Sequence, residues 1–304
     1  MRSDPADYEL VTPETLETAL NLLAEKSVGW RPVAGGTDVM VQFAAGHLAS
    51  RKLFSIWNLP ELRRIEILPG DIRIGAGSTY TDLRKHEAIA REFPLLARAA
   101  SWTGGIANQN RGTLGGNIAN ASPAADSLPA LLVYDADLIL ISARGERRVP
   151  YRDFHTGYKQ MNLAADELIR AICLPRKYDG YVSYTRKVGA RNAQAISKVC
   201  IAALGQVERG APQHVVDGVV GPIINGVRIA LGSVAPVPIR LVETERILSG
   251  KPLDAAKIAE ARKIAVAETR SIDDIRSTAR YRAAVVSNLV GEFLEKLASS
   301  PGMQ

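Results

Sequence analysis

The chain has 304 residues, of which 46% are hydrophobic and 23% are charged, and its formal net charge at pH 7 is +6. This length and composition exclude a disordered chain and indicate a globular protein of two or three modest domains. The cations are scattered, and the densest run, RGERR at residues 144–148, lacks interleaved aromatic residues. We therefore expect a solvent-exposed hairpin there and no nucleic-acid partner.

The residue types that hold metals or form catalytic centres are sparse. Cys173 and Cys200 lie in apolar contexts, so we expect buried free thiols and no iron–sulfur cluster. The histidines have no ligand spacing and are expected on the surface or in packing roles: His47, His86, His155 and His214. The N-terminus lacks the apolar core of a signal peptide, and no stretch is apolar enough to predict a membrane span. We therefore expect a cytoplasmic chain without a metal site.

The N-terminal residues predict a small α/β subdomain over residues 1–58. TPETLETALNLLAEK at 12–26 predicts a helix with Thr12 as its N-cap and Pro13 at the first helical position. Its apolar face would consist of Leu16, Ala19, Leu20 and Leu23. Short strands are predicted for WRPVAGG at 30–36 and LFSIWNL at 53–59.

A second subdomain is predicted over residues 59–176. Residues 62–83 alternate as short strands with turns at Pro69-Gly70 and at Gly75–Gly77, and one helix is expected over 81–101. Residues 136–154 predict two strands joined by an Arg-Gly turn, and DELIRAICLP, which ends at Pro175, predicts a closing strand.

The remaining residues, 177–304, predict a third domain. Residues 180–207 and 224–241 have the β-branched content and turns of an antiparallel sheet. Residues 254–269 and 279–297 have apolar side chains at three- and four-residue spacing, which predicts two helices. The whole chain is therefore expected to have an α+β fold.

Two segments contain a Gly-Gly pair: VAGGTDVMV at 33–41 and GTLGGNIANASPAAD at 112–126. Glycine serves where backbone turns through positive φ or approaches another group, and consecutive N–H groups in such turns bind anions. Two such turns, each beside a predicted strand end, would hold the two phosphates of a pyrophosphate. Neither segment fits the Walker or G-x-G-x-x-G pattern, so classical P-loop and Rossmann binding are disfavoured.

The neighbours of these glycines suit a nucleotide, although a simpler interpretation stays open. Hydroxyls and amides are offered by Thr37, Thr113, Asn117 and Asn120. Asp126 is suited to accept a hydrogen bond from a ribose or ribityl hydroxyl. In the alternative, each Gly-Gly pair is a hairpin turn and Asp126 caps a helix that begins near Ser127.

The joint occurrence of AGGTDVMV and, some eighty positions later, GTLGGNIANASPAADSLPALL closely resembles the FAD-binding medium subunit of the molybdenum hydroxylases. This is the family of xanthine dehydrogenase and aerobic carbon monoxide dehydrogenase. The resemblance covers nearly the whole chain, including the helix expected at 12–26. It implies a PCMH-type FAD-binding fold of two α/β subdomains followed by a C-terminal antiparallel sheet with helices.

The resemblance also implies which residues bind FAD. The first segment would wrap the pyrophosphate through the backbone amides of Ala34, Gly35, Gly36, Thr37, Asp38 and Val39. The second would contact the phosphates and the ribityl chain through Thr113, Gly115, Gly116, Asn117 and Asn120, while Asp126 binds a flavin hydroxyl. Lys187 matches a basic residue that reaches toward the flavin ring. This chain has Asn110-Arg111-Gly112 where the family commonly has Ile-Arg-Asn, so the turn before Thr113 is expected to differ.

The implied function is electron transfer. The family's medium subunit works with a small subunit that carries two [2Fe–2S] clusters and a large molybdopterin subunit, in a heterotrimer or its dimer. FAD would pass electrons from the clusters to a terminal acceptor. Two rivals stay open: a stand-alone FAD-dependent reductase that resembles the UDP-N-acetylenolpyruvylglucosamine reductases, and a scaffold that has lost its flavin. We identify neither the proton donor nor the sugar-nucleotide pocket that the first rival needs. The intact glycine pairs and Asp126 disfavour the second.

Overall fold

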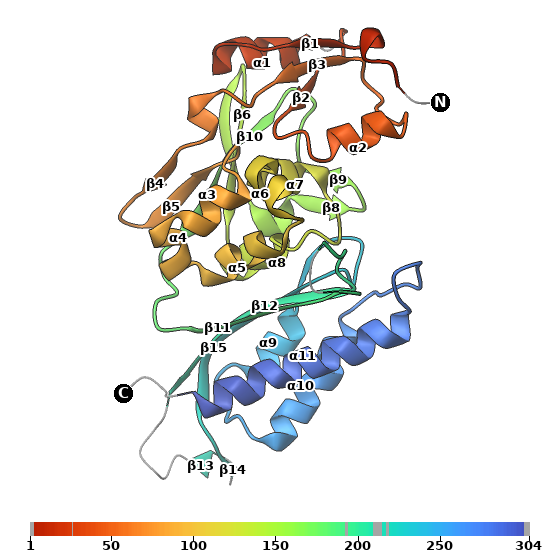
Figure 1. Ribbon diagram of the computed structural model, residues 1–304. Helices are drawn as coiled ribbons and strands as arrows, with labels where there is room; N and C mark the ends of the chain where they lie inside the picture. The colour runs from red at the N-terminus through yellow and green to blue at the C-terminus, as the bar shows by residue number, and fades with distance from the viewer. Residues whose placement is uncertain (1–2, 26, 192–193, 209–214, 217–218, 301–304) are drawn as a thin grey trace.

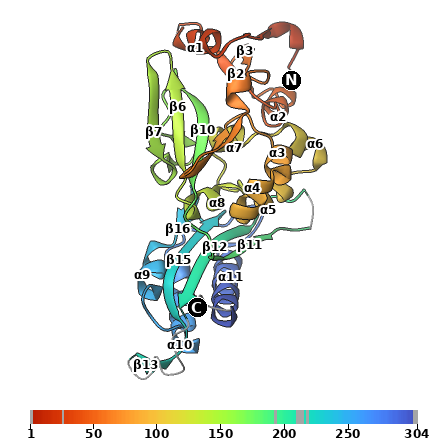
Figure 2. The same ribbon diagram turned by 90° about the vertical axis from the view of Figure 1, so that its left-hand side faces the viewer.

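The computed structural model describes residues 3–25, 27–191, 194–208, 215–216 and 219–300. The elements form three tiers in chain order. The N-terminal subdomain lies at the top of Figure 1, a second sheet with its helices in the middle, and the C-terminal sheet with its helices at the bottom. Figure 2 shows the same order from the side. The mixed α+β class is confirmed.

The first tier is a parallel three-stranded sheet in the order β1-β3-β2, with Glu9 paired to Lys52 and Arg31 to Leu53. The strands are β1 (Glu9–Val11), β2 (Arg31–Val33) and β3 (Lys52–Ser55). The helices are η1 (Pro5–Asp7), α1 (Leu16–Ala24) and α2 (Val39–Ala44). Strand β1 was not predicted.

Helix α1 begins later than predicted. Thr15, not Thr12, is its N-cap, because the Thr15 hydroxyl accepts a hydrogen bond from the Thr18 amide at 3.1 Å. The predicted apolar face is confirmed, since Ala19, Leu20 and Leu23 are buried and Leu16 packs against the same cluster.

The second tier is an antiparallel sheet in the order β4-β5-β10-β6-β7. Its strands are β4 (Ile65–Ile67), β5 (Asp71–Gly75), β6 (Asp137–Ser142), β7 (Gly145–Pro150) and β10 (Leu168–Pro175), and β8 (His155–Gly157) with β9 (Gln160–Met161) forms a separate hairpin. The helices are η2 (Pro60–Leu62), α3 (Tyr80–Lys85), α4 (Glu87–Glu92), α5 (Pro94–Trp102), α6 (Ile106–Arg111), α7 (Leu114–Asn120), α8 (Leu128–Val133) and η3 (Tyr151–Asp153).

The single helix predicted over 81–101 is wrong, because three helices occupy that span. His86 leaves helical geometry with ψ 112° and separates α3 from α4. Phe93 then precedes Pro94, and a residue before proline is sterically disfavoured in the helical region. The predicted strands on either side are confirmed.

The third tier is an antiparallel sheet in the order β11-β12-β15-β16. Its strands are β11 (Val182–Val188), β12 (Val199–Glu208), β15 (Ile223–Gly232) and β16 (Ile239–Arg240), and β13 (Val215–Val216) pairs with β14 (Val219–Val220). The two predicted helices are α10 (Ala255–Ala267) and α11 (Ala279–Ser299), and a further helix, α9 (Val242–Leu248), was not predicted.

Both faces of the C-terminal sheet are buried. The sheet therefore joins the middle and C-terminal tiers. Figure 1 shows α5 and α8 above it and α10 and α11 below. Because successive strand residues point to opposite faces, Ala202 and Leu204 pack into the core of the middle tier, while Ile201 and Ala203 pack against the C-terminal helices. One face of the C-terminal sheet therefore completes the core of the middle tier, and the other face forms a separate core with the C-terminal helices.

Two minor expectations, the buried thiols and the exposed hairpin, are confirmed. Both cysteines are buried free thiols. Residues 145–148 are exposed on strand β7, and Arg147 and Arg148 pair with Glu167 and Asp137. None of the helices within the described ranges has the length and apolar character to cross a membrane. His214 lies outside the described residues.

Candidate functional site

The first Gly-Gly segment is an open loop between β2 and α2, at a strand end as predicted. Gly36 has φ +79°, a left-handed conformation that glycine adopts readily. The backbone amides of residues 35–39 have no protein acceptor within the described part of the chain. The segment therefore presents consecutive free N–H groups, the arrangement that binds anions.

The second Gly-Gly segment has a different conformation, which corrects the predicted strand-end turn. Residues 114–120 form helix α7, and Thr113 is its N-cap. All four amides of the first turn are used: those of Leu114 and Gly115 donate to the Ser78 and Ala76 carbonyls at 3.0 and 2.8 Å. The remaining two, from Gly116 and Asn117, donate to Thr113. The capping hydroxyl completes the helix, so no amide is left for an anion.

The two segments touch at the boundary between the first and second tiers. A Cβ on Gly35 would lie 1.6 Å from the Arg111 carbonyl oxygen, at the end of α6. Arg111 in turn donates from Nε to the Gly35 carbonyl at 3.3 Å and stacks its guanidinium 3.9 Å from the centre of the Trp57 ring. Gly35 is therefore required by close backbone packing, whereas Gly36 is required by its φ angle.

A polar bridge that sequence reasoning missed links the two segments to a third. Asn120, at the end of α7, donates from Nδ2 to Asp38 Oδ1 at 3.3 Å. Lys159, in the turn of the β8–β9 hairpin, donates to the backbone oxygen of Asn120 and, at 2.8 Å, to its Oδ1. Asn120 was predicted as a site residue, but a lone lysine in a short hairpin gave no sequence signal. Figure 1 shows α2, α7 and this hairpin together on one side of the molecule.

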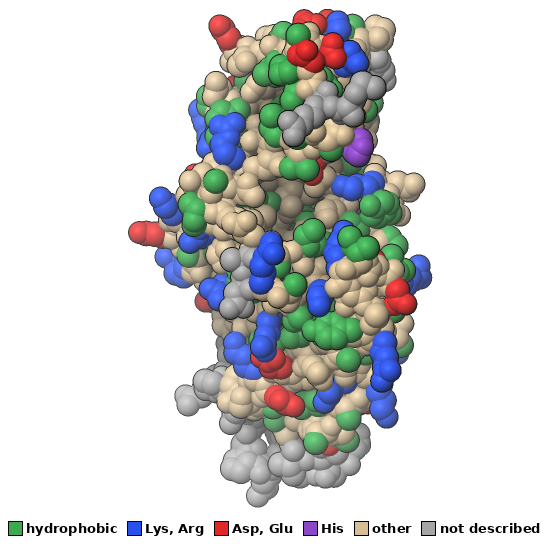
Figure 3. Space-filling model, turned by 45° about the vertical axis from the view of Figure 1, so that its right-hand side comes forward, with side chains coloured by type: hydrophobic (Ala, Val, Ile, Leu, Met, Phe, Trp, Pro, Cys, Tyr) green, Lys and Arg blue, Asp and Glu red, His purple; other side chains and the backbone are tan. Residues whose placement is uncertain are grey.

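That side is hollowed between the upper two tiers. Figure 3 views it directly and shows a surface of mostly backbone and uncharged polar atoms in the hollow. Thr37 and Asp38 are exposed, whereas Thr113 and Gly115 are buried. Asn117 is partly buried, and its Oδ1 accepts a 2.5 Å hydrogen bond from the Ser127 hydroxyl.

Asp126 does not cap the following helix but forms a buried ion pair with Lys187. Its side chain is 6% exposed, and Lys187 Nζ lies 2.6 Å from Oδ2. The Ser197 hydroxyl donates to Oδ1, and Lys187 also donates to the Trp102 carbonyl at 3.2 Å. Burial raises the pKa of Asp126 above its ordinary value, although Lys187 and Ser197 oppose this. This ion pair links the middle tier to strand β11, and it brings the two predicted site residues, Asp126 and Lys187, into direct contact.

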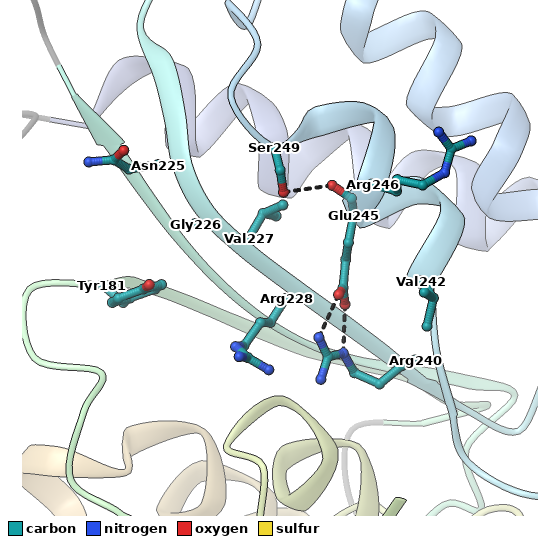
Figure 4. Close-up of a pocket in the computed structure, with 10 residues that line it drawn as sticks. All are labelled: Tyr181, Asn225, Gly226, Val227, Arg228, Arg240, Val242, Glu245, Arg246 and Ser249. Carbon is teal, nitrogen blue, oxygen red and sulfur yellow. Dashed lines mark hydrogen bonds and ion pairs between the residues drawn. The ribbon is translucent and has the colours of Figure 1, made fainter.

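A separate pocket of about 470 Å³ lies in the third tier, on residues that the sequence did not indicate. Figure 4 shows Arg240 held by both carboxylate oxygens of Glu245, with Arg228 beside it. Arg228 pairs with Asp135 at 2.7 Å, and Arg246 pairs with Glu243 at 2.8 Å. Each of these arginines thus has a carboxylate partner within the protein.

Metal ligation has no support within the described ranges, where no group of His, Cys, Asp and Glu has a suitable arrangement. His155 is hydrogen-bonded between the Ile118 carbonyl at 2.9 Å and the Tyr151 hydroxyl at 3.2 Å. Burial lowers its pKa. His155 is therefore a neutral packing residue, as predicted, while His47 is exposed.

Two family models match the chain. The FAD binding domain in molybdopterin dehydrogenase matches residues 6–177, and the CO dehydrogenase flavoprotein C-terminal domain matches residues 184–297. Together they span the site and the C-terminal sheet.

Known proteins of similar length also match. The xanthine dehydrogenase FAD-binding subunit of Escherichia coli O157:H7 is 31% identical over 95% of each chain. The glyceraldehyde dehydrogenase medium chain of Sulfolobus acidocaldarius is 28% identical, over 97% of this chain and 99% of its own. A solved structure of carbon monoxide dehydrogenase from Hydrogenophaga pseudoflava superposes with a TM-score of 0.85 at 25% identity, covering 94% of this chain and 95% of the other. Nothing in these comparisons supports the UDP-N-acetylenolpyruvylglucosamine reductase alternative. The chain belongs to the family of FAD-binding subunits of molybdopterin dehydrogenases, oxidoreductase components whose cofactor is FAD.

Proposed function

We propose that this chain is the electron-transfer subunit of a molybdenum hydroxylase complex. In this proposal the chain holds FAD, which would link the [2Fe–2S] clusters of a small partner subunit to a terminal acceptor. A large molybdopterin subunit oxidises the substrate, and the assembly is a dimer of heterotrimers in the cytoplasm. The matched relatives have similar lengths but names that refer to different substrates, which supports a substrate site outside this chain.

The observation that carries the proposal is the open loop at residues 35–39. Its unpaired backbone amides and the left-handed Gly36 fit the pyrophosphate of a dinucleotide, because phosphate oxygens can accept several N–H groups at once. Ala34 leads into this loop from β2. We therefore assign the pyrophosphate mainly to the first segment, through the backbone of Ala34, Gly35, Gly36, Thr37, Asp38 and Val39.

The second segment would contribute differently. Because its first-turn amides already have protein acceptors, we assign it side-chain contacts through Asn117 and Asn120. Thr113 and Gly115 have a supporting role, since the hydroxyl of the former caps the helix and the latter lets α7 pack against Ala76. Gly116 is exposed at the start of α7 and keeps the surface there free of a side chain.

The buried pair would hold the flavin end of the cofactor. Asp126 retains oxygen lone pairs beyond those used by Lys187 and Ser197, so it can accept a hydrogen bond from a flavin hydroxyl. The Lys187 amino group lies beside it and would face the flavin ring. Flavin accepts electrons singly and releases them in pairs, which is the chemistry that links iron–sulfur clusters to a two-electron acceptor. The residues of this chain bind and orient it.

The visible absorption spectrum of the purified full-length chain, before and after incubation with FAD and removal of the excess, tests the proposal. We expect near-stoichiometric flavin bands without an iron–sulfur shoulder, followed by capture of the two partner subunits. A folded chain that stays colourless would contradict it. Reduction of a UDP-sugar substrate by the chain alone would instead favour the reductase alternative.

A further inference from the structure

The proposed phosphate site has an electrostatic imbalance if only the predicted residues form it. A pyrophosphate diester carries a negative charge on each phosphate, and the loop that would bind it contains the exposed carboxylate of Asp38. Of the residues predicted to bind FAD, Lys187 alone is cationic, and it pairs with Asp126. A further cation beside the loop would correct this imbalance.

Lys159 is a cation in the right place. Its Nζ lies 2.8 Å from Asn120 Oδ1, and Asn120 lies 3.3 Å from Asp38, so one amide side chain joins the lysine to the open loop. Within the described residues, Lys159 forms no ion pair with a carboxylate. Its charge is therefore held beside the loop but is not neutralised by a direct partner.

The backbone at Lys159 supports a specific role. Its φ is +58°, a left-handed conformation that is uncommon for residues other than glycine and that clusters at functional sites. The Gly157–Gln160 pair closes the β8–β9 hairpin on either side, and the short turn directs the lysine to the end of α7. Burial lowers the Lys159 pKa, the Asp38 carboxylate opposes that change, and Arg31 adds to it, so the lysine lies within the electrostatic field of the first segment.

We propose that Lys159 is a cation of the FAD phosphate site, with Asn120 as the residue that positions it. The hairpin then forms a third wall of the site, in addition to the two Gly-Gly segments. In this arrangement the amide of Asn120 separates Lys159 from Asp38, which keeps the ammonium group available to phosphate oxygens as a charge-assisted donor. This inference rests on the proposed function, since it assumes that residues 35–39 bind the pyrophosphate.

The test measures ligand affinity in the full-length chain by quenching of flavin fluorescence. Lys159→Gln removes the charge, Lys159→Arg retains it, and Lys85→Gln removes a charge from an exposed lysine on α3. The ligands are FAD, riboflavin, which has no phosphate, and ADP as a competitor of FAD.

Lys159→Gln is expected to weaken binding of both FAD and ADP by about tenfold to a hundredfold, the usual range for a hydrogen bond to a charged group. Riboflavin affinity should not change, Lys159→Arg should retain most of the FAD affinity, and Lys85→Gln should bind as the parent does. The loss should shrink at high salt because the interaction is electrostatic.

Two results would overturn the inference: parental FAD affinity in Lys159→Gln, or an equal loss for FAD and riboflavin, which would indicate a structural role through Asn120. Thermal unfolding of each variant checks that the hairpin change leaves the fold intact.

The proposed function is tested separately. If Gly36→Ala weakens FAD binding while Lys159→Gln does not, the result supports the phosphate site at residues 35–39 and refutes the proposed role of Lys159. If the parent chain binds neither FAD nor ADP, the proposed function itself fails.

Discussion

The two Gly-Gly segments have the same dipeptide in opposite structural contexts. Residues 35–39 form a loop whose amides are open and whose Gly36 has positive φ, whereas residues 114–120 form a helix whose first amides all have acceptors. In the loop, Gly36 is needed for its conformation and Gly35 for close packing against Arg111. In the helix, Gly115 is needed for space, because its missing side chain lets α7 approach Ala76. A shared motif therefore does not imply a shared mode of phosphate binding.

Of the variants at positions 36, 38, 115, 116 and 250, Gly115→Ala should have the largest effect on stability. A Cβ at this position would lie 2.5 Å from the Ala76 side chain and 2.8 Å from its carbonyl oxygen, so the helix must shift. Overpacking of this kind typically costs about 1–3 kcal/mol, so we expect the flavin-free variant to melt several degrees lower.

Gly116→Ala is the matched control for this packing effect. Gly116 is exposed, and its Cβ would closely approach the Thr113 hydroxyl, at 2.8 Å. Because alanine also favours helix, we expect a smaller change in the melting temperature than for Gly115→Ala. Equal melting temperatures for Gly115→Ala and the parent would show that close packing is not the reason for this glycine.

Gly36→Ala should lower the affinity for FAD more than it disturbs the fold. Its Cβ would meet only Met40, at 3.7 Å, but the left-handed backbone costs a residue with a side chain about 1–2 kcal/mol. If the loop relaxes to avoid this strain, the open amides move apart, and FAD affinity should fall by about tenfold in a fluorescence titration.

Gly250→Ala controls for backbone strain alone. Gly250 has φ +71° with no neighbouring atom within 4 Å, and it lies in the third tier. Gly250→Ala should lose about as much stability as Gly36→Ala does, and it should keep the FAD affinity of the parent chain. If Gly36→Ala and Gly250→Ala bind FAD with equal affinity, the open conformation of residues 35–39 does not contribute to FAD binding.

Asp38→Asn should give the smallest effect, in the opposite direction. Removing an exposed negative charge beside the pyrophosphate should raise FAD affinity by about twofold to fivefold at low salt, with less gain at high salt. Isothermal titration at two salt concentrations measures this. A clear loss of affinity would show that the carboxylate accepts a hydrogen bond from the cofactor, so that its charge is not simply unfavourable.

Local sequence patterns predicted most of the strands and the long helices correctly. The 3.6-residue periodicity of residues 279–297 and the alternation of residues 65–75 depend on which side chains face a core, and a pattern of apolar residues records this directly. Some errors lie at boundaries, whereas β1, α7 and α9 were missed altogether. The N-cap at Thr15 and the break at His86 depend on one hydrogen bond or one dihedral angle, which competing neighbours offered equally well.

The candidate site was predicted in part. The Gly-Gly segments, Asp126 and Lys187 were identified from the sequence, and the structure brings Asp126 and Lys187 within 2.6 Å of each other. The placement of Lys159 was not predictable, because the hairpin that carries it is short and meets Asn120, 39 positions earlier, only in the folded middle tier.

The sequence by itself determined the order of the three tiers, the two glycine segments and the family, because these depend on local periodicity and on motifs read along the chain. Only the tertiary structure decided which amides stay free. The carbonyls of Ser78 and Ala76, which accept from Leu114 and Gly115, reach α7 through packing of the chain against itself. Among the residues that the structure describes, no comparable acceptor reaches residues 35–39. Whether a backbone amide can bind a ligand depends on its partners in space, which the order of residues does not show.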